Sequence, residues 1–151
     1  MIRYALLGAL GAAACVSGTL RPVAPAAEFA VEGSPPRALD AVLSAVTSQG
    51  LSLRLHDPVA GVVETDYADI GEFYPNSAQF PQAERLVRFR VIVIPAETGY
   101  GSQVAIEARY SPFAVGGSIE RRRERAVPRD HPAMQLVAAL QEAITERARG
   151  L

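Results

Sequence analysis

The side chains that can do covalent or metal chemistry in this sequence are few and widely spaced. There is one cysteine, Cys15, and the two histidines are His56 and His131. Two histidines alone cannot supply the common zinc ligand sets, and no serine stands in the Gly-x-Ser-x-Gly pattern of a nucleophile elbow. The pair Gly116-Gly117 lacks the further glycines and the lysine of a phosphate-binding loop. We therefore expect no catalytic, cofactor-binding or metal-binding site.

Cys15 lies at the end of an apolar segment near the start of the chain. Met1–Tyr4 carries the amino terminus and Arg3, and Ala5–Val16 is a run of uncharged, mostly apolar residues. A helix that crosses a bilayer needs roughly 20 apolar residues, so this run is too short for a transmembrane anchor. Its length and its basic flank are typical of a secretory signal peptide, which we place at residues 1–14.

The sequence Ala12-Ala13-Ala14-Cys15 resembles the lipobox of bacterial lipoproteins, although Ala12 stands where that motif usually has leucine. The resemblance implies cleavage before Cys15, acylation of Cys15 as the new N-terminus, and attachment to a membrane through the lipid. Because Val16 and not aspartate follows the cysteine, it also implies the outer membrane, with the protein facing the periplasm. Ala12-x-Ala14 suits ordinary signal peptidase as well, so a secreted or periplasmic protein without lipid, and an uncleaved segment, remain as alternatives.

The segment after the cysteine is expected to be a tether. Residues 15–33 are rich in proline, alanine and glycine, a composition typical of a flexible to semi-extended linker. Residues 34–151 are then long enough for a single folded domain. Since one cysteine cannot form an internal disulfide, packing alone must stabilise that domain.

Two segments of the domain have the apolar periodicity of helices that cover a core. Ser34-Pro35-Pro36 is a typical helix start, and Gly50 marks the expected end. Near the end of the chain, Asp130 is expected to cap a second helix, with Pro132 in its first turn. The apolar stripes consist of Leu39, Val42, Leu43 and Val46 in the first helix, and of Ala133, Leu136, Val137, Leu140 and Ile144 in the second.

Between the helices, apolar and polar residues alternate in the pattern of β-strands. The expected strands cover residues 51–55, 62–67, 85–94 and 102–110, with an optional fifth at 119–127 and a long loop at 68–84. Arg88 or Arg90 then lies opposite Glu107 on the solvent face, where such a pair contributes roughly 0.2–1 kcal/mol. In the order α-β-β-β-β(-β)-α, these elements predict an α+β, two-layer domain. Its four- to five-stranded, mostly antiparallel sheet carries two helices on one face.

The first helix, the strand Leu51–Leu55 and the tight turn Asp57–Gly61 into Val62–Tyr67 resemble the repeat of BamC-type envelope lipoproteins. The resemblance implies a helix before a small antiparallel sheet, a closing helix, and a location in the bacterial envelope. It also implies an accessory, non-enzymatic role in envelope assemblies. No functional residue is carried over, because these segments contain no diagnostic motif.

The charge of the chain argues against one class of partner. The formal net charge is −1, and all fifteen basic residues are arginine. Nucleic-acid binding asks for a clearly basic face with interleaved aromatic residues, so we expect no nucleic acid as a partner. In an extended segment Arg121, Arg123 and Arg125 would point to one side and contact lipid headgroup phosphates or an acidic partner. The alternative is a solvated edge strand that its charge protects from self-association.

An acidic group precedes the predicted loop and continues into it. Its members are Glu64, Asp66, Asp69 and Glu72. Their spacing does not match a calcium loop, which needs closely spaced oxygen ligands and a glycine at its sharp turn. We therefore expect these side chains to pair with the arginines or to be solvated, with a weak cation site as the alternative.

Three aromatic residues, Phe73, Tyr74 and Phe80, lie within the predicted loop at 68–84. Their rings either pack on the core as a small cluster or form an exposed docking surface, where Phe73 and Tyr74 would contact a partner. Neither interpretation is excluded by the residues themselves.

These observations predict a non-enzymatic accessory or interaction lipoprotein of the bacterial cell envelope. It would be held on the membrane by the lipid on Cys15 and have an envelope protein as its partner. The alternatives are a small-ligand or lipid-binding periplasmic module, and a minor enzyme of unknown reaction. A binding module needs a concave apolar cavity. An accessory protein needs a filled core and an exposed patch on a loop or sheet edge. An enzyme needs polar groups that converge on one site.

Overall fold

Two long helices form where apolar residues recur every three to four positions. In the computed structural model, which describes residues 23–75, 79–110 and 124–150, α1 spans Pro35–Ser48 and α4 spans Ala133–Gly150. The end of α1 is closed by Gly50 at φ 73°, and the Leu51 N–H donates to the Val46 carbonyl over 3.2 Å. Both predicted helices are confirmed.

Seven strands of the described chain form one antiparallel sheet. Their spatial order is β1-β6-β5-β3-β2, with β4 beside β5 and β7 beside β6. The strands are β1 (Ala27–Val31), β2 (Leu53–Asp57), β3 (Val62–Thr65), β4 (Ala68–Asp69), β5 (Leu86–Pro95), β6 (Ser102–Tyr110) and β7 (Arg125–Ala126). Two single-turn helices, α2 (Ile70–Phe73) and α3 (Gln82–Arg85), lie between β4 and β5.

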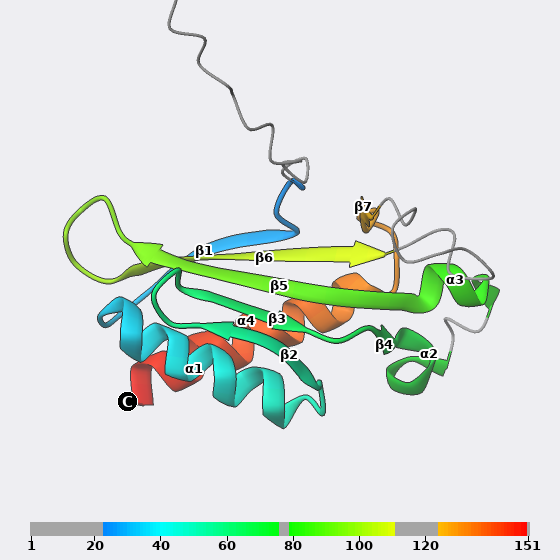
Figure 1. The fold of residues 1–151 in the computed structure, drawn as a ribbon, viewed down its shortest axis with the longest axis horizontal. Helices are drawn as coiled ribbons and strands as arrows, with labels where there is room; N and C mark the ends of the chain where they lie inside the picture. The colour runs from blue at the N-terminus through cyan, green and yellow to red at the C-terminus, as the bar shows by residue number, and fades with distance from the viewer. Residues whose placement is uncertain (1–22, 76–78, 111–123, 151) are drawn as a thin grey trace, which may run out of the picture.

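The two long helices cover one face of the sheet, and the described chain places no long helix on the other face, which we call the open face (Figure 1). The core lies between these layers, and its largest fully buried side chains include Phe89 from β5, Ile106 from β6, Val42 from α1, and Leu136 and Ile144 from α4. The prediction of an α+β, two-layer domain is therefore confirmed. Within the described residues, no helix has both the length and the hydropathy needed to cross a bilayer.

Strand β1 is the main element that the sequence did not predict. Ala27–Val31 falls in the segment predicted as a tether, yet all five residues pair with β6. The Ser102 hydroxyl, buried at the start of β6, also donates to the Gly33 carbonyl over 3.0 Å. The folded part of the chain thus begins before residue 34, and an edge strand precedes α1.

The segment predicted as a long loop at 68–84 is more ordered than expected. It contains β4, α2 and α3, and Asp69 caps α2 by accepting the Gly71 N–H over 2.8 Å. Of the optional fifth strand at 119–127, the described residues contain the two-residue β7, while 119–123 lie outside them. Arg90 lies opposite Glu107 in the register of β5 and β6, as predicted.

Candidate functional site

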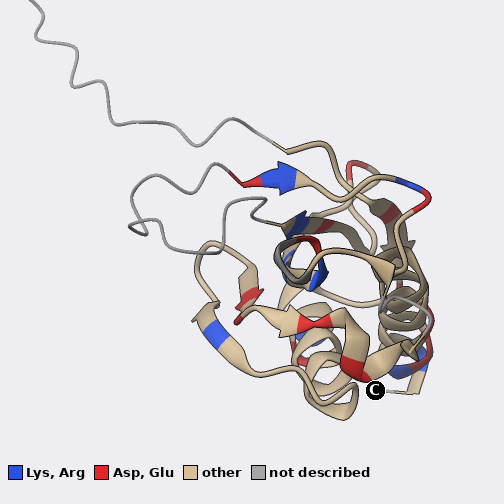
Figure 2. Ribbon diagram, turned by 90° about the vertical axis from the view of Figure 1, so that its right-hand side faces the viewer, with Lys and Arg blue, Asp and Glu red and all other residues tan. Residues whose placement is uncertain are grey.

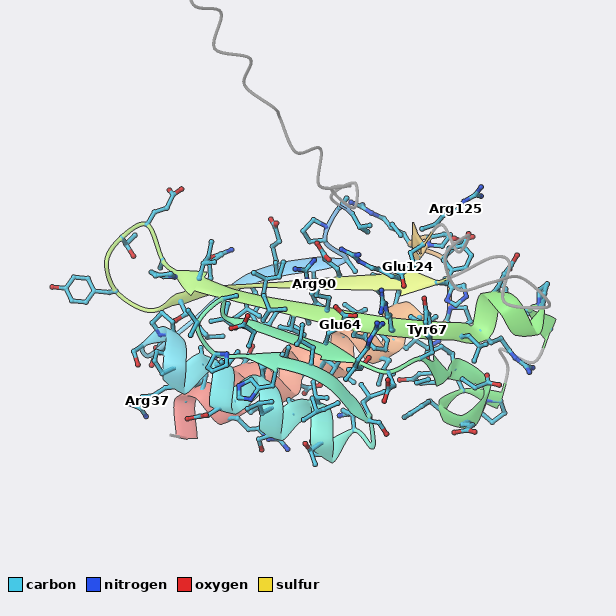
Figure 3. All side chains as sticks on the ribbon, in the orientation of Figure 1. Arg37, Glu64, Tyr67, Arg90, Glu124 and Arg125 are labelled. Carbon is cyan, nitrogen blue, oxygen red and sulfur yellow. The ribbon has the colours of Figure 1, made fainter. Side chains whose placement is uncertain are left out.

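A connected group of charged side chains lies on the open face of the sheet, and we call it the open-face cluster. Figure 3 labels three of its members close to β5: Glu64 in β3, Tyr67 in the β3–β4 connection, and Glu124 just before β7. The ion pairs and hydrogen bonds of the cluster join Arg54, Glu64, Tyr67, Arg88, Glu107, Arg109 and Glu124.

Glu124 is the centre of the open-face cluster. Its Oε1 lies 2.6 Å from Arg88 Nη2 and accepts a hydrogen bond from the Tyr67 hydroxyl, while its Oε2 lies 3.5 Å from Arg109 Nη1. Arg88 also lies 2.6 Å from Glu64 and 5.3 Å from the centroid of the Tyr67 ring. Through these contacts, the residue before β7 is bound to side chains of β5 and β6.

The pair of Glu107 and Arg109 is the most deeply buried part of this cluster. Arg109 donates to Glu107 Oε2 through Nε at 3.1 Å and Nη2 at 2.5 Å, and the two residues are only 3% and 6% exposed, respectively. Glu107 therefore pairs with Arg109 of its own strand and not with the expected Arg90. Buried charges are stable only when they are paired, so each of these two residues depends on the other.

His131 forms a second buried polar site, at the start of α4. Its Nδ1 accepts the Ala133 N–H over 3.1 Å, so the ring proton is on Nε2, which donates to the Glu84 carbonyl over 3.1 Å. The ring also stacks against Tyr110 at 6.3 Å and lies 5.2 Å from Phe80. His131 thus takes the capping role predicted for Asp130, because its ring accepts the Ala133 N–H within the first turn.

Lowering the pH is expected to destabilise the protein through His131. Burial lowers the pKa of His131 from 6.5, against the opposing influence of the Glu84 carbonyl and of the Glu84 and Asp130 charges. The unfolded chain therefore binds this proton more readily, and the free energy of unfolding falls as the pH drops below about 6.5. Urea unfolding at about pH 8 and about pH 5 measures the difference.

The control for this prediction is His131→Asn, which keeps an oxygen that accepts at a helix start but does not titrate. The pH-dependent part of the free energy of unfolding should shrink in this variant. It should persist in His56→Gln, because His56 is exposed on β2. An equal pH response in wild type and His131→Asn would contradict the assignment.

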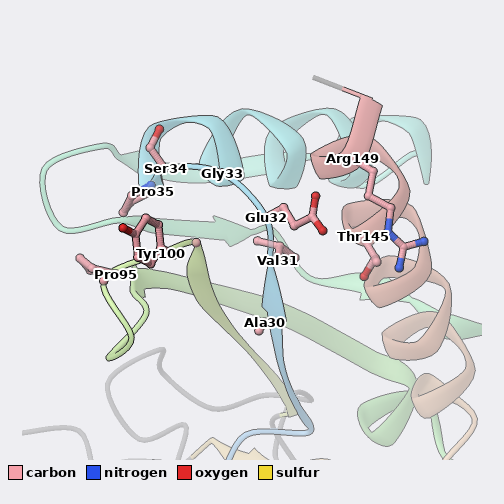
Figure 4. Close-up of a pocket in the computed structure, with 12 residues that line it drawn as sticks. Ala30, Val31, Glu32, Gly33, Ser34, Pro35, Pro95, Tyr100, Thr145 and Arg149 are labelled. Atoms are coloured by element: carbon pink, nitrogen blue, oxygen red, sulfur yellow. The ribbon is translucent and has the colours of Figure 1, made fainter.

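The surface of the domain is hollowed beside β1. A groove of about 740 Å³ lies between the end of β1, the β5–β6 hairpin and the last turn of α4 (Figure 4). Glu32, Thr145 and Arg149 lie along one side of it, and Pro35 and Tyr100 along the other. A smaller hollow of about 330 Å³ runs along α4 and shares Thr145 and Arg149 with the groove.

The opposite edge of the sheet, β2, carries apolar side chains in solvent. Leu53 and Leu55 are 44% and 46% exposed, and Val59 in the turn between β2 and β3 is 97% exposed. Within the described chain, β2 pairs with β3 alone, so its outer edge has no neighbouring strand there. This edge combines free backbone groups with exposed leucines.

The residues predicted as contact sites fall in different places. Cys15, Arg121 and Arg123 lie outside the described residues. Arg125 is exposed in β7, near the point where the described chain begins (Figures 1 and 2). Phe73 and Tyr74 pack against the core, which supports the packing interpretation over a docking surface.

The four acidic residues Glu64, Asp66, Asp69 and Glu72 do not form one site in the structure. Glu64 pairs with Arg54 at 3.4 Å and with Arg88, and Asp69 lies 3.4 Å from Arg85, whereas Asp66 and Glu72 are exposed. For Glu64 and Asp69 the pairing interpretation is thus confirmed. Among the described residues, no three His, Cys, Asp or Glu side chains are grouped to hold a metal ion.

Sequence reasoning missed the open-face cluster, the groove beside β1 and the exposed leucines of β2. The sequence did contain one signal for the cluster, because Glu124 interrupts a run of arginines. A comparison of the chain with protein-family models and with curated proteins found no match. The structural class of the protein is therefore given by its fold. It is a two-layer α+β domain in which, among the described residues, the strands β1 and β2 each have one edge without a neighbouring strand.

Proposed function

We propose that this protein is a non-enzymatic interaction lipoprotein of the bacterial cell envelope, which binds a protein partner through the β2 edge. The observation that carries the proposal is the pair of exposed leucines, Leu53 and Leu55, on an edge strand. The register of β2 with β3 shifts between these two leucines, and Arg54 lies between them, so the edge has features that discourage unspecific strand pairing. Apolar side chains that stay exposed on such an edge favour a specific partner.

The filled core supports an interaction role over the binding of a small ligand between the layers. Side chains from both helices and from β3, β5 and β6 occupy the space between helices and sheet. The hollows described above lie at the surface and are lined by strand ends, loops and one helix flank. The carboxylates of the open-face cluster are each paired with an arginine, although Arg88 Nε has no hydrogen-bond partner among the described residues. This pairing of the acidic groups supports the non-enzymatic part of the proposal.

The proposed lipid on Cys15 would lie a short distance along the chain from the described domain. Val23 follows Cys15 by eight residues, so the extended chain between them reaches at most about 28 Å. A lipid on Cys15 would therefore keep the domain close to the bilayer. Arg125 lies on the same side of the domain as the start of the described chain, where a cation would meet anionic headgroups (Figures 1 and 3).

One experiment with two readouts tests this proposal. The protein is extracted with detergent from its own membranes, with a photocrosslinking residue in place of Leu55. We expect an intact mass that begins at Cys15 and includes added acyl groups, and a crosslink to one discrete protein. An unmodified cysteine, or a start downstream of it, would contradict the anchor.

The matched control separates the β2 edge from other exposed apolar residues. Leu53→Gln is expected to abolish the crosslink, because it removes the neighbouring apolar contact on the same strand. Ile94→Gln should leave it unchanged, since Ile94 is similarly exposed, at 51%, near the far end of β5. Equal loss in both variants would show that the β2 edge is not the docking surface.

A further inference from the structure

Strand β1 is a second free edge of the sheet, at the opposite side from β2. All five of its residues pair with β6, and no other strand of the described chain lies on its outer side. An edge strand presents backbone N–H and C=O groups that an extended peptide can pair with. Such strand addition is a recurrent mode of peptide recognition, in which backbone hydrogen bonds give affinity and flanking side chains give specificity.

Beside this edge, α4 forms a shelf that would support an added strand. The groove is lined by Ala30 and Val31 at the end of β1 and shares Thr145 and Arg149 with the hollow along α4, so the two hollows adjoin and reach the end of this edge. Ala138, Gln141, Thr145 and Arg149 line the shelf at helical spacing. Residues 138–149 of a helix extend about 16 Å, which corresponds to about five residues of extended chain. That length is the length of β1.

The shelf and the adjoining strand are acidic. Glu142 and Glu146 line the hollow along α4, and Glu32 lines the groove at the end of β1. All three are exposed, and none makes an ion pair with another described residue, whereas Arg149 is the single cation among the residues that line the two hollows. Uncompensated carboxylates beside a strand edge favour a basic partner and oppose an acidic one.

The same charges argue against a second copy of this chain as the occupant. Pairing two β1 edges would bring their acidic shelves together, and Glu28 within β1 would add to the repulsion. Charge of this kind is a common protection of edge strands against self-association. A basic segment of another protein has the opposite charge and meets no such repulsion.

We propose that the β1 edge and the α4 shelf bind an extended, basic polypeptide segment as an additional strand of the sheet. This site lies across the sheet from β2, and the proposal does not rest on the docking surface or the lipid anchor proposed above. The partner would supply alternating basic and small apolar side chains, with the basic ones near Glu142 and Glu146.

The test uses the full chain and a fluorescent peptide of about seven residues that alternates arginine and valine, a length that covers the edge. We expect saturable binding by fluorescence anisotropy, with amide NMR shifts concentrated in residues 27–31. Glu142→Gln with Glu146→Gln should weaken binding about fivefold, a loss typical of one to two exposed ion pairs. Asp66→Asn with Glu72→Gln removes the same charge from exposed positions elsewhere and should leave binding unchanged.

A second probe separates strand addition from simple charge attraction. The same peptide with every backbone nitrogen methylated keeps its charge but cannot donate the hydrogen bonds of a strand from either of its edges. It should lose most of its binding. Equal affinity of both peptides, equal loss in the two double variants, or amide shifts centred on β2 would each overturn the proposal. The anchor and the docking surface on β2 are tested separately, by the intact mass and by the crosslink from position 55.

Discussion

Glu107→Leu is expected to lower the free energy of unfolding by about 3 kcal/mol, because it leaves a buried arginine without its main partner. Arg109 is 3% exposed and donates to Glu107 through both Nε and Nη2. Its remaining carboxylate neighbour, Glu124, lies 3.5 Å away and is shared with Arg88. Chemical denaturation followed by circular dichroism measures the loss.

The double variant Glu107→Leu with Arg109→Met should recover most of this stability. Replacing a buried ion pair by apolar residues of similar volume is often neutral, whereas removing one partner leaves an uncompensated charge. The double-variant cycle therefore measures the coupling between the two residues. If the double variant were as unstable as the sum of the two single variants, the cost would come from lost packing and not from the unpaired charge.

Arg54→Ala provides the comparison with an exposed ion pair. The Arg54 side chain is 54% exposed, and Glu64 keeps Arg88 as a closer partner. The change should be within about 0.5 kcal/mol, as is usual for surface pairs. A loss for Glu107→Leu that is no larger than this would mean that water reaches Arg109.

The elements that could be predicted from the sequence are those whose signal is local. The stripe of Leu39, Val42 and Val46 repeats at helical spacing, and the long strands β5 and β6 alternate apolar and polar residues on either side of a glycine-containing hairpin. Each pattern lies within a short window, so no knowledge of distant contacts was needed. The hairpin predicted Arg88 or Arg90 opposite Glu107, and the structure places Arg90 there in the strand register.

The parts that could not be predicted depend on distant partners. Ala27–Val31 has little strand character of its own, and its partner β6 lies some seventy residues further along the chain. The hydrogen bond between Tyr67 and Glu124 joins residues 57 positions apart. At α4, Asp130 is the stronger capping residue by propensity, but the buried ring of His131 provides the acceptor.

The leucines at the start of β2 have the alternation of a strand, but the structure does not bury them together on one face of the sheet. Leu51, Leu53 and Leu55 alternate as one side of a strand should, yet β2 begins at Leu53, and Leu51 alone of the three is buried. The register with β3 shifts between Leu53 and Leu55, so the two residues are not equivalent positions of a regular ladder. The exposed leucines that carry the proposed function were therefore visible in the sequence only as a strand pattern.

Gly61→Ala should destabilise the protein by about 3 kcal/mol, of which about 1 is backbone strain and about 2 is the cost of overpacking. Gly61 has a φ of 65°, and a Cβ at this position would lie 2.2 Å from the Val93 carbonyl oxygen. The approach is close because the Val93 N–H donates to the Gly61 carbonyl over 2.8 Å at the entry to β3. Thermal or urea unfolding measures the change.

Gly99→Ala isolates the strain from the clash. Gly99 has a similar φ of 76°, but a Cβ there would meet no atom within 4 Å. Its cost should therefore be the strain alone, about 1 kcal/mol. If the two variants were equally stable, the turn between β2 and β3 would have moved away from Val93 without cost. Because that turn carries the exposed Val59 and sets the position of β2, such freedom would also mean that the β2 edge is not held as a fixed docking surface.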